Sequence, residues 1–292
     1  MSSYRYRVVD VFTEHALEGN PLAVFPDASG MDDATMQKIA KEMNLSETTF
    51  VLPPTRPNCL ARVRIFTPTR EMVFAGHPTI GTSFVLLDEK AAPANSERFN
   101  LDEKVGPVPI RVEHGARPRI WLTTPPIQWG KSFDRSMCAR ALGLDAGDLL
   151  DLAPQLVSAG NPNVFIALKD KNAVDRSWLD AAGLAQIKEP GQDAICIFVF
   201  TPTPDGAYSR MFAPEHGVME DPATGSATGP LAAYMMRNNL ASKAAGARFL
   251  SEQGTKMGRR SILYIQVNGA AGVDGIEVGG YVTPLVNASM AL

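Results

Sequence analysis

The alternation of apolar and polar residues along the chain predicts a protein built mainly of β-strands. Runs with a period of two residues, or short wholly apolar runs, are separated by turn residues in both halves of the sequence. In the first half, strands are expected at 4–12, 21–26, 48–52, 61–67, 98–102, 107–113 and 119–123. In the second half, they are expected at 163–168, 194–201, 207–212, 247–252, 260–267 and 275–284.

Helical periodicity predicts two surface helices. In the segment 33–44 the apolar residues form one stripe that begins at Met36, and Asp32 precedes the segment as an N-cap. A second such helix is expected near 177–187. The segment 130–150 opens with a Gly-Lys-Ser turn and continues with a short helical stretch, so it is expected to connect the two halves.

Two further segments contain no charged residue. They are 79–87, TIGTSFVLL, and 226–236, SATGPLAAYMM. A helix that is apolar on every side must be enclosed by other structure, so each half is expected to be a curved sheet around one central helix. Pro78 suits the first turn of the first helix, where its missing N–H costs nothing. Pro230 implies that the second helix begins close to Ser226 or is irregular in its first turn.

Four short echoes recur in the same order in the two halves, which indicates a duplication. They are Gly19-Asn20-Pro21 with Gly160-Asn161-Pro162, 49–52 with 197–200, Arg64-x-Phe66-x-Pro68 with Arg210-x-Phe212-x-Pro214, and Gly76-His77-Pro78-Thr79 with Gly225-Ser226-Ala227-Thr228. Single strand-and-turn fragments recur by coincidence, but four echoes with offsets between 141 and 149 residues favour a repeated fold. The expected class is α+β, with one lobe at 1–129 and a second at 130–292 whose last strand is free to pack back on the first lobe.

Composition and charge exclude several kinds of partner. Of the 292 residues, 45% are hydrophobic and 20% are charged, which is typical of a globular protein. The net charge is −3 and the longest basic run is the pair Arg259-Arg260, so nucleic acid is not an expected partner. No apolar run is long enough to span a membrane and the first twelve residues do not resemble a signal peptide, so we expect a cytoplasmic protein with no membrane partner.

The sequence shows no pattern for a metal or a nucleotide cofactor. The three cysteines, Cys59, Cys138 and Cys196, are widely spaced and fit neither a disulfide framework nor a zinc site. The glycine-rich run at 224–229 is not followed by the lysine of a P-loop, and no G-x-G-x-x-G follows the first strand. We therefore expect no metal and no cofactor.

The starts of the two enclosed helices are the candidate binding sites. Gly76 and Gly225 open segments whose first N–H groups are unpaired and whose helix dipoles are positive, which suits a carboxylate or a developing oxyanion. Taken singly, each is an ordinary turn glycine before a helix. The symmetric pair favours the binding interpretation, with one small anionic substrate contacted from both halves.

Three ionisable residues near these helix starts have two interpretations each. His77 is expected to have its pKa lowered by the helix dipole and to act as a neutral donor or proton relay, or else to be a capping histidine. Asp221 could orient a substrate amine or hydroxyl, or cap the turn before Pro222. Glu47 lies between a predicted helix and a predicted strand, where a glutamate is usually a solvated surface residue.

The motifs together resemble those of the phenazine-biosynthesis PhzF family, from about residue 6 to the C-terminus. The matching segments are Gly19-Asn20-Pro21, Met43-Asn44-Leu45-Ser46-Glu47-Thr48, Arg64-Ile65-Phe66-Thr67-Pro68, Phe74-Ala75-Gly76-His77-Pro78 and Asp221-Pro222-Ala223-Thr224-Gly225-Ser226-Ala227-x-Gly229-Pro230. The resemblance implies the diaminopimelate-epimerase-like fold, with two similar domains that each place a mixed sheet around a central helix.

The resemblance also implies a chemistry. In the family's phenazine enzyme, a trans-2,3-dihydro-3-hydroxyanthranilate isomerase that uses no cofactor, the glutamate of the Asn-Leu-Ser-Glu motif moves the proton, and Glu47 matches it. His77, Asp221 and Ser226 match positions that line the substrate site. The epimerases and racemases of this fold place a cysteine at each helix start, and no cysteine stands there in this chain, which disfavours a two-thiol mechanism.

The expected function is a cofactor-independent isomerase that shifts a proton in a small carboxylated substrate, cyclic or amino-acid-like. The alternatives are an epimerase or lyase that uses the same site, or a non-catalytic member that binds a small molecule. Phenazine production is not implied, because family members are far more widespread than that pathway. A homodimer is compatible with the sequence but is not required, since the two halves would form the site within one chain.

Overall fold

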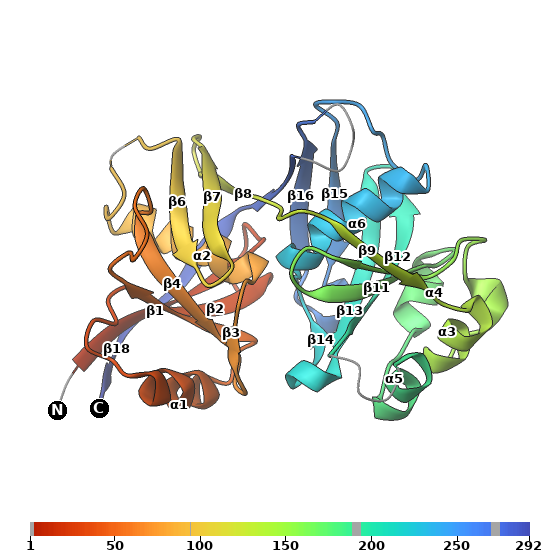
Figure 1. Ribbon diagram of the computed structural model, residues 1–292, viewed down its shortest axis with the longest axis horizontal. Helices are drawn as coiled ribbons and strands as arrows, with labels where there is room; N and C mark the ends of the chain where they lie inside the picture. Colours follow the sequence, from red (N-terminus) through yellow and green to blue (C-terminus); the bar gives the residue numbers. More distant parts are fainter. Residues whose placement is uncertain (1–2, 94, 189–193, 270–274) are drawn as a thin grey trace. The chain divides into compact units, whose positions relative to one another are not determined.

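The computed structural model describes residues 3–93, 95–188, 194–269 and 275–292, which fold as two compact units (Figure 1). The first unit comprises 1–123 and 278–292, and the second comprises 124–277. The first unit thus ends at Thr123 rather than at residue 129, and the last strand, β18 (Val282–Ala291), belongs to the first unit and pairs with its first strand.

The first unit is a mixed sheet with two helices. Its elements in chain order are β1 (Ser3–Val11), β2 (Asn20–Phe25), α1 (Asp33–Met43), β3 (Glu47–Leu52), β4 (Ala61–Phe66), β5 (Glu71–Met72), α2 (Gly76–Asp88), β6 (Arg98–Glu103), β7 (Gly106–Glu113), β8 (Arg119–Thr123) and β18. Strand β1 pairs antiparallel with β18 and β2, and β2 pairs in parallel with β3. Strand β4 pairs antiparallel with β3 and β5 and in parallel with β6, after which β7 and β8 follow as antiparallel neighbours.

The two helices of the first unit differ in their surroundings, as their sequences require. Helix α1 is amphipathic, has Asp32 as its N-cap and packs Met36, Ile39 and Ala40 against one face of the sheet. Helix α2 is enclosed, with nearly every residue buried. Gly81 allows its close approach to β2, because an added Cβ would lie 2.6 Å from the side chain of Leu22.

The second unit repeats this arrangement with a longer set of helices. Its elements are β9 (Gln128–Ser132), α3 (Arg135–Ala141), β10 (Gln155–Ser158), β11 (Pro162–Ala167), α4 (Lys171–Arg176), α5 (Ala181–Ile187), β12 (Cys196–Thr203), β13 (Gly206–Ala213), β14 (Val218–Asp221), α6 (Gly225–Arg237), β15 (Arg248–Gln253) and β16 (Ser261–Val267), and β17 (Ile276–Gly280) leads back to the first unit. Short 3₁₀ turns lie at 146–148, 214–216 and 255–257.

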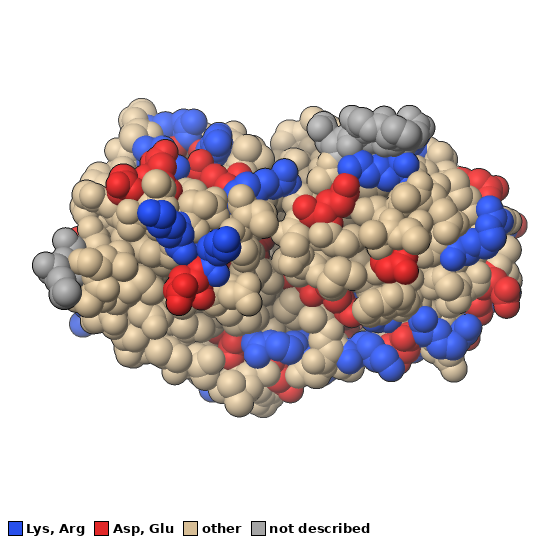
Figure 2. All heavy atoms as spheres, turned by 90° about the horizontal axis from the view of Figure 1, so that it is seen from below, with Lys and Arg blue, Asp and Glu red and all other residues tan. Residues whose placement is uncertain are grey.

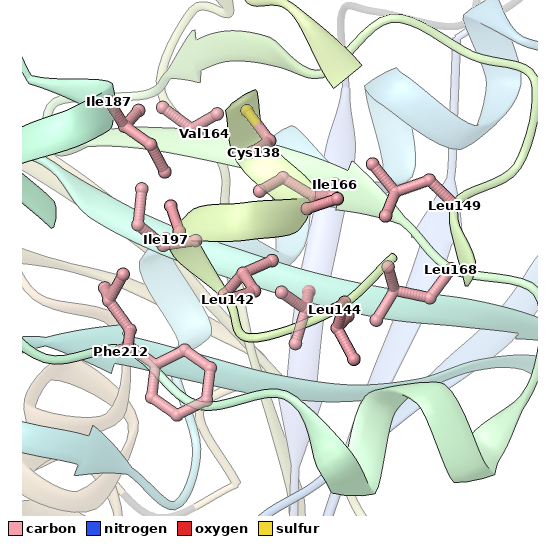
Figure 3. Packing of buried hydrophobic residues seen from close by; sticks show 14 of the residues in the cluster. Cys138, Leu142, Leu144, Leu149, Val164, Ile166, Leu168, Ile187, Ile197 and Phe212 are labelled. Atoms are coloured by element: carbon pink, nitrogen blue, oxygen red, sulfur yellow. The ribbon is translucent and has the colours of Figure 1, made fainter. Parts of the chain in front are cut away.

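Both faces of the second sheet are covered. Helix α6 packs against one face through a core that includes Phe165, Phe198 and Tyr234. Helices α3, α4 and α5 cover the other face, where aliphatic residues of β11 and β12 meet Cys138 and Leu142 of the α3 region (Figure 3). The alternation along β11 and β12 sends successive side chains into these two cores.

Most strand pairings of the first unit have a counterpart in the second. Strands β11 and β12 are parallel as β2 and β3 are, and β13 pairs antiparallel with β12 and β14 and in parallel with β15, as β4 does with β3, β5 and β6. The last pairs correspond as well, because β9 lies beside β10 as β18 lies beside β1. The expected α+β class with a duplicated mixed sheet around a central helix is confirmed.

The helix predicted at 177–187 is wrong at its beginning. The chain forms α4 before this segment, runs extended from residue 177 to 180, and then forms α5. The side chain of Asp180 accepts a hydrogen bond from the N–H of Gly183 and thereby starts a new helix.

Three other expectations are corrected or refined. The segment 130–150 is not only a connection, because β9 ends at Ser132 and pairs with β10 before α3 begins. The single strand expected at 275–284 is two strands, β17 and β18. Helix α6 begins at Gly225, close to Ser226 as inferred, and Pro230 lies within it, where it removes one backbone donor.

The described part of the chain has no helix long and apolar enough to cross a membrane. Acidic and basic side chains are interspersed on the face of the molecule in Figure 2, without a large area of one sign. This face therefore offers no extended surface of one charge.

Candidate active site

The start of α2 presents unused backbone donors in the first unit. Its N-cap residue, Ala75, offers no side-chain cap, and the third helical residue is Pro78, which has no N–H. The N–H groups of Gly76 and His77 are thus the donors that the helix itself does not use. Both residues are buried, and they lie where the helix dipole favours negative charge.

His77 faces Glu47 at this helix start. The Nε2 atom of His77 lies 3.4 Å from Oε2 of Glu47, which is the first residue of β3. The side chain of His77 is 4% exposed and that of Glu47 is 16% exposed. Glu47 is therefore not the fully solvated surface residue that its place in the sequence suggests.

Asn20 selects the tautomer of the neutral His77 ring. Its Nδ2 lies 3.1 Å from Nδ1 of His77, and because an amide nitrogen can only donate, Nδ1 must accept and the ring hydrogen sits on Nε2. Burial lowers the pKa of His77 to about 3, so the ring is neutral at physiological pH. The direction agrees with the expectation from the sequence, and burial of the ring is its cause.

Replacing Asn20 with aspartate is expected to reverse this tautomer. A carboxylate accepts a hydrogen bond from Nδ1–H and favours the protonated ring, so the pKa of His77 should rise and Nδ1 should carry a hydrogen. Two-dimensional ¹H–¹⁵N NMR of the imidazole nitrogens measures both. An Nδ1–H tautomer in the unsubstituted protein would contradict the assignment.

The start of α6 in the second unit is built in a similar way. Its N-cap residue Thr224 provides no side-chain cap, and Gly225 and Ser226 are its first residues. The Thr224 hydroxyl donates to the carboxylate of Asp221 at 2.5 Å, and Gln253 donates to the backbone oxygen of Asp221 at 2.7 Å. Asp221 is 7% exposed, so its capping contact and a role toward a ligand are both compatible with its position.

The asparagines of the two Gly-Asn-Pro echoes reach equivalent residues. Asn20 contacts His77, the second residue of α2, and Asn161 donates to the hydroxyl of Ser226, the second residue of α6, at 3.4 Å. Both asparagines were visible in the sequence as part of the repeat but were not recognised as site residues. Their shared place in the Gly-Asn-Pro echo, ahead of an enclosed helix in each half, was the signal that could have identified them.

The structure brings the predicted residues together in two groups. Glu47, Gly76 and His77 meet in the first unit, and Asp221, Gly225 and Ser226 meet in the second, each group at the start of the enclosed helix. No cysteine stands at either helix start. Cys138 is a buried residue of α3, where burial raises its pKa to about 12. Cys196 begins β12, and Cys59 precedes β4.

Metal ligands do not gather anywhere in the described residues: no three His, Cys, Asp or Glu side chains are placed to hold an ion. The two groups offer carboxylate, imidazole, hydroxyl and backbone N–H functions.

Comparisons with known proteins identify relatives of this chain. The family model of the phenazine biosynthesis-like proteins, PhzC-PhzF, matches residues 9–286. A trans-2,3-dihydro-3-hydroxyanthranilate isomerase of Pseudomonas aeruginosa is 35% identical over 280 residues, which is 95% of each chain. The corresponding isomerase of Pseudomonas fluorescens is 34% identical over 280 residues, again 95% of each chain.

Solved structures show the same fold. A PhzF-family protein of Bacillus anthracis has a TM-score of 0.86 at 24% identity and covers 100% of both chains. A protein of Pseudomonas aeruginosa described as a predicted epimerase has a TM-score of 0.83 at 33% identity over 99% of both chains. Because the family model matches nearly the whole chain, the chain belongs to the phenazine biosynthesis-like PhzC-PhzF family.

Proposed function

We propose that this chain is a cofactor-independent isomerase that moves a proton within a small carboxylated substrate. The observation that carries the proposal is that Oε2 of Glu47 lies 3.4 Å from Nε2 of a neutral His77 at the uncapped start of α2. A carboxylate that takes a proton from carbon works best beside hydrogen-bond donors that stabilise the charge developing on the substrate.

Each residue of the first unit has a role in this proposal. Glu47 removes the proton from one carbon and delivers it to another, and the Nε2–H of His77 donates to the Glu47 carboxylate or to the substrate. The N–H groups of Gly76 and His77 bind the substrate carboxylate or the enolate-like oxygen that forms when the proton leaves. Burial keeps His77 neutral, so in this proposal the backbone N–H groups rather than an imidazolium bind the substrate anion.

The second unit supplies further binding groups in the proposal. Asp221 and the Ser226 hydroxyl would bind an amine or hydroxyl of the substrate, and the first N–H groups of α6 would bind an oxyanion. The pairing of Asn161 with Ser226 supports this role, because it repeats the pairing of Asn20 with His77.

The named relatives support isomerisation over the other proton-transfer reactions. Two proteins 34–35% identical over almost their whole length carry the name of an isomerase that acts on a dihydroaromatic amino acid. A racemase with two thiol bases would need cysteines at the helix starts, which hold Gly76-His77 and Gly225-Ser226 instead. We therefore place the substrate among cyclic or amino-acid-like carboxylates.

Solvent-deuterium exchange tests the proposal. The purified protein is incubated in D2O, without added cofactor, with a panel of cyclic amino acids and dihydroaromatic acids, and products are examined by NMR and mass spectrometry. Deuterium at carbon in a double-bond isomer is the expected result. A deuterated stereoisomer would replace isomerase by epimerase, fragments would replace it by lyase, and binding without exchange would identify a non-catalytic member.

A further inference from the structure

A buried carboxyl group that the proposed reaction does not use lies beside the first turn of α2. Glu103 is the last residue of β6 and is 2% exposed. Its Oε1 lies 2.6 Å from the hydroxyl oxygen of Thr79, which is the fourth residue of α2. Its Oε2 has no hydrogen-bond partner among the described residues. An ionised carboxylate would leave charge on a buried oxygen without a donor, which is costly.

Counting hydrogens at Thr79 shows which form of Glu103 fits. The Thr79 hydroxyl lies 2.7 Å from the backbone oxygen of Ala75 as well as 2.6 Å from Oε1 of Glu103. A hydroxyl has one hydrogen to donate, and a backbone oxygen can only accept. Both contacts are hydrogen bonds only if Glu103 is protonated and donates to Thr79, which in turn donates to Ala75.

The charged groups around Glu103 leave this acid without an ion pair in the described part of the chain. Arg56 donates a hydrogen bond to the backbone oxygen of Glu103, but it forms its ion pair with the carboxylate of Asp102. Lys104 extends to Glu71 on β5, and the neighbouring His77 is neutral. Burial without a compensating cation raises the pKa of Glu103 to about 8.

The second unit has a neutral donor at the corresponding place. Strand β15 corresponds to β6, and both begin with Arg-Phe, but β15 ends in Gln253 where β6 ends in Glu103. The amide of Gln253 donates to the Thr224 hydroxyl at 3.0 Å and to the backbone oxygen of Asp221 at 2.7 Å, just before α6. A protonated glutamate has the shape and donor capacity of this amide.

We propose that Glu103 is a positioning residue, held as a neutral acid, that acts through Thr79 to orient the Ala75–Gly76 peptide at the start of α2. The N–H of Gly76 belongs to the same planar peptide as the Ala75 oxygen, so holding the oxygen aims the N–H. The Thr79 N–H is 3.3 Å from that oxygen, which makes the hydroxyl at 2.7 Å the shorter of the two contacts. The role in catalysis rests on the proposed function.

Ionisation of Glu103 would reverse the chain of donors. Once the proton is lost, the Thr79 hydroxyl donates to the carboxylate and the Ala75 oxygen loses its shorter donor. The Gly76 N–H is then held less firmly, and a donor displaced from its productive position lowers kcat/KM by about 10- to 100-fold. Activity should therefore fall as the pH rises through about 8, with Glu103 neutral below that value.

Glu103→Gln separates this role from simple packing. The glutamine amide can donate to Thr79 at every pH, so the variant should match the unsubstituted protein at about pH 7 and keep its activity above about pH 9, where the unsubstituted protein loses it. Thr79→Val should have low activity already at about pH 7, whereas Thr79→Ser should follow the pH profile of the unsubstituted protein. Glu97→Gln, an exposed glutamate just before β6, is the matched control and should change nothing.

Two measurements without substrate keep the inference distinct from the proposed function. Infrared difference spectra between the unsubstituted protein and Glu103→Gln should show a protonated carboxylic acid at about pH 6 that is lost at about pH 10. The Gly76 amide resonance should titrate with the same midpoint and be flat in Glu103→Gln. An ionised Glu103 at about pH 6, or a Gly76 amide resonance that does not change with the ionisation of Glu103, would overturn the inference. Absence of any turnover would overturn only the proposed function.

Discussion

Replacing Glu47 with glutamine is expected to lower turnover of a responsive substrate by about 10²- to 10⁴-fold, the usual contribution of a general acid–base group. Glutamine keeps the size of the side chain but cannot accept and return a proton. Solvent-deuterium uptake at carbon should fall together with turnover, because both depend on the same proton transfer. The NMR assay in D2O follows both quantities in one experiment.

The fold should be unaffected by this substitution, which makes the result interpretable. Glu47 is partly exposed at the start of β3, and glutamine keeps an oxygen acceptor near Nε2 of His77. Glu42→Gln, on the exposed side of α1, is the matched control and should retain full activity. Full deuterium uptake by Glu47→Gln would remove Glu47 as the proton carrier.

Most of the fold was predictable because its strands and central helices have clear hydrophobic patterns. The uncharged segments after Gly76 and Gly225 could only be enclosed helices, and α2 and α6 are buried along almost their whole length. The pairing of β18 with β1 was left open by the sequence, since a strand pattern does not specify which edge the strand joins.

The errors lie where an element is too short for its period to be read. Helix α4 has six residues, fewer than two turns, so its start depends on a cap rather than on a stripe. Asp170 supplies that cap by accepting from the N–H of Ala173. Strand β9 contains glycine and lysine and is largely exposed, so its five residues lack the apolar alternation that predicts a strand.

The candidate site was predictable in its elements but not in its contacts. The duplication pointed to the helix starts, and the family motif pointed to Glu47. The pairing of Asn20 with His77 joins residues 57 positions apart, and its effect on the tautomer depends on atomic geometry that no sequence spacing encodes. Glu103 escaped notice for the same reason, because a strand-terminal glutamate reads as a surface residue until its burial is known.

Replacing Arg210 with methionine is expected to reduce the stability of the second unit by about 3–5 kcal/mol, the range for breaking a buried ion pair. The guanidinium, 5% exposed, makes two 2.8 Å contacts with Glu220, which is 11% exposed. It also donates to three backbone oxygens of the α4 region, those of Val174, Asp175 and Ser177. Methionine leaves a nearly buried carboxylate and these oxygens without their donor. Hydrogen exchange of amides in β13 measures the loss locally, since a protein of two units need not unfold in one step.

The duplicated fold supplies its own control for this prediction, because Arg64 is the counterpart of Arg210 in the first unit. Arg64 stacks over Phe66 as Arg210 stacks over Phe212, but its partners are more exposed, at 21% for Glu71 and 82% for Asp33. Water solvates these carboxylates when the guanidinium is removed, so Arg64→Met should cost only about 1–2 kcal/mol. Equal losses in the two variants would mean that the packing of the arginine stem, rather than burial of the pair, determines the contribution. A larger loss for Arg210→Met would show that the same motif gives unequal stability in the two units because its partners differ in burial.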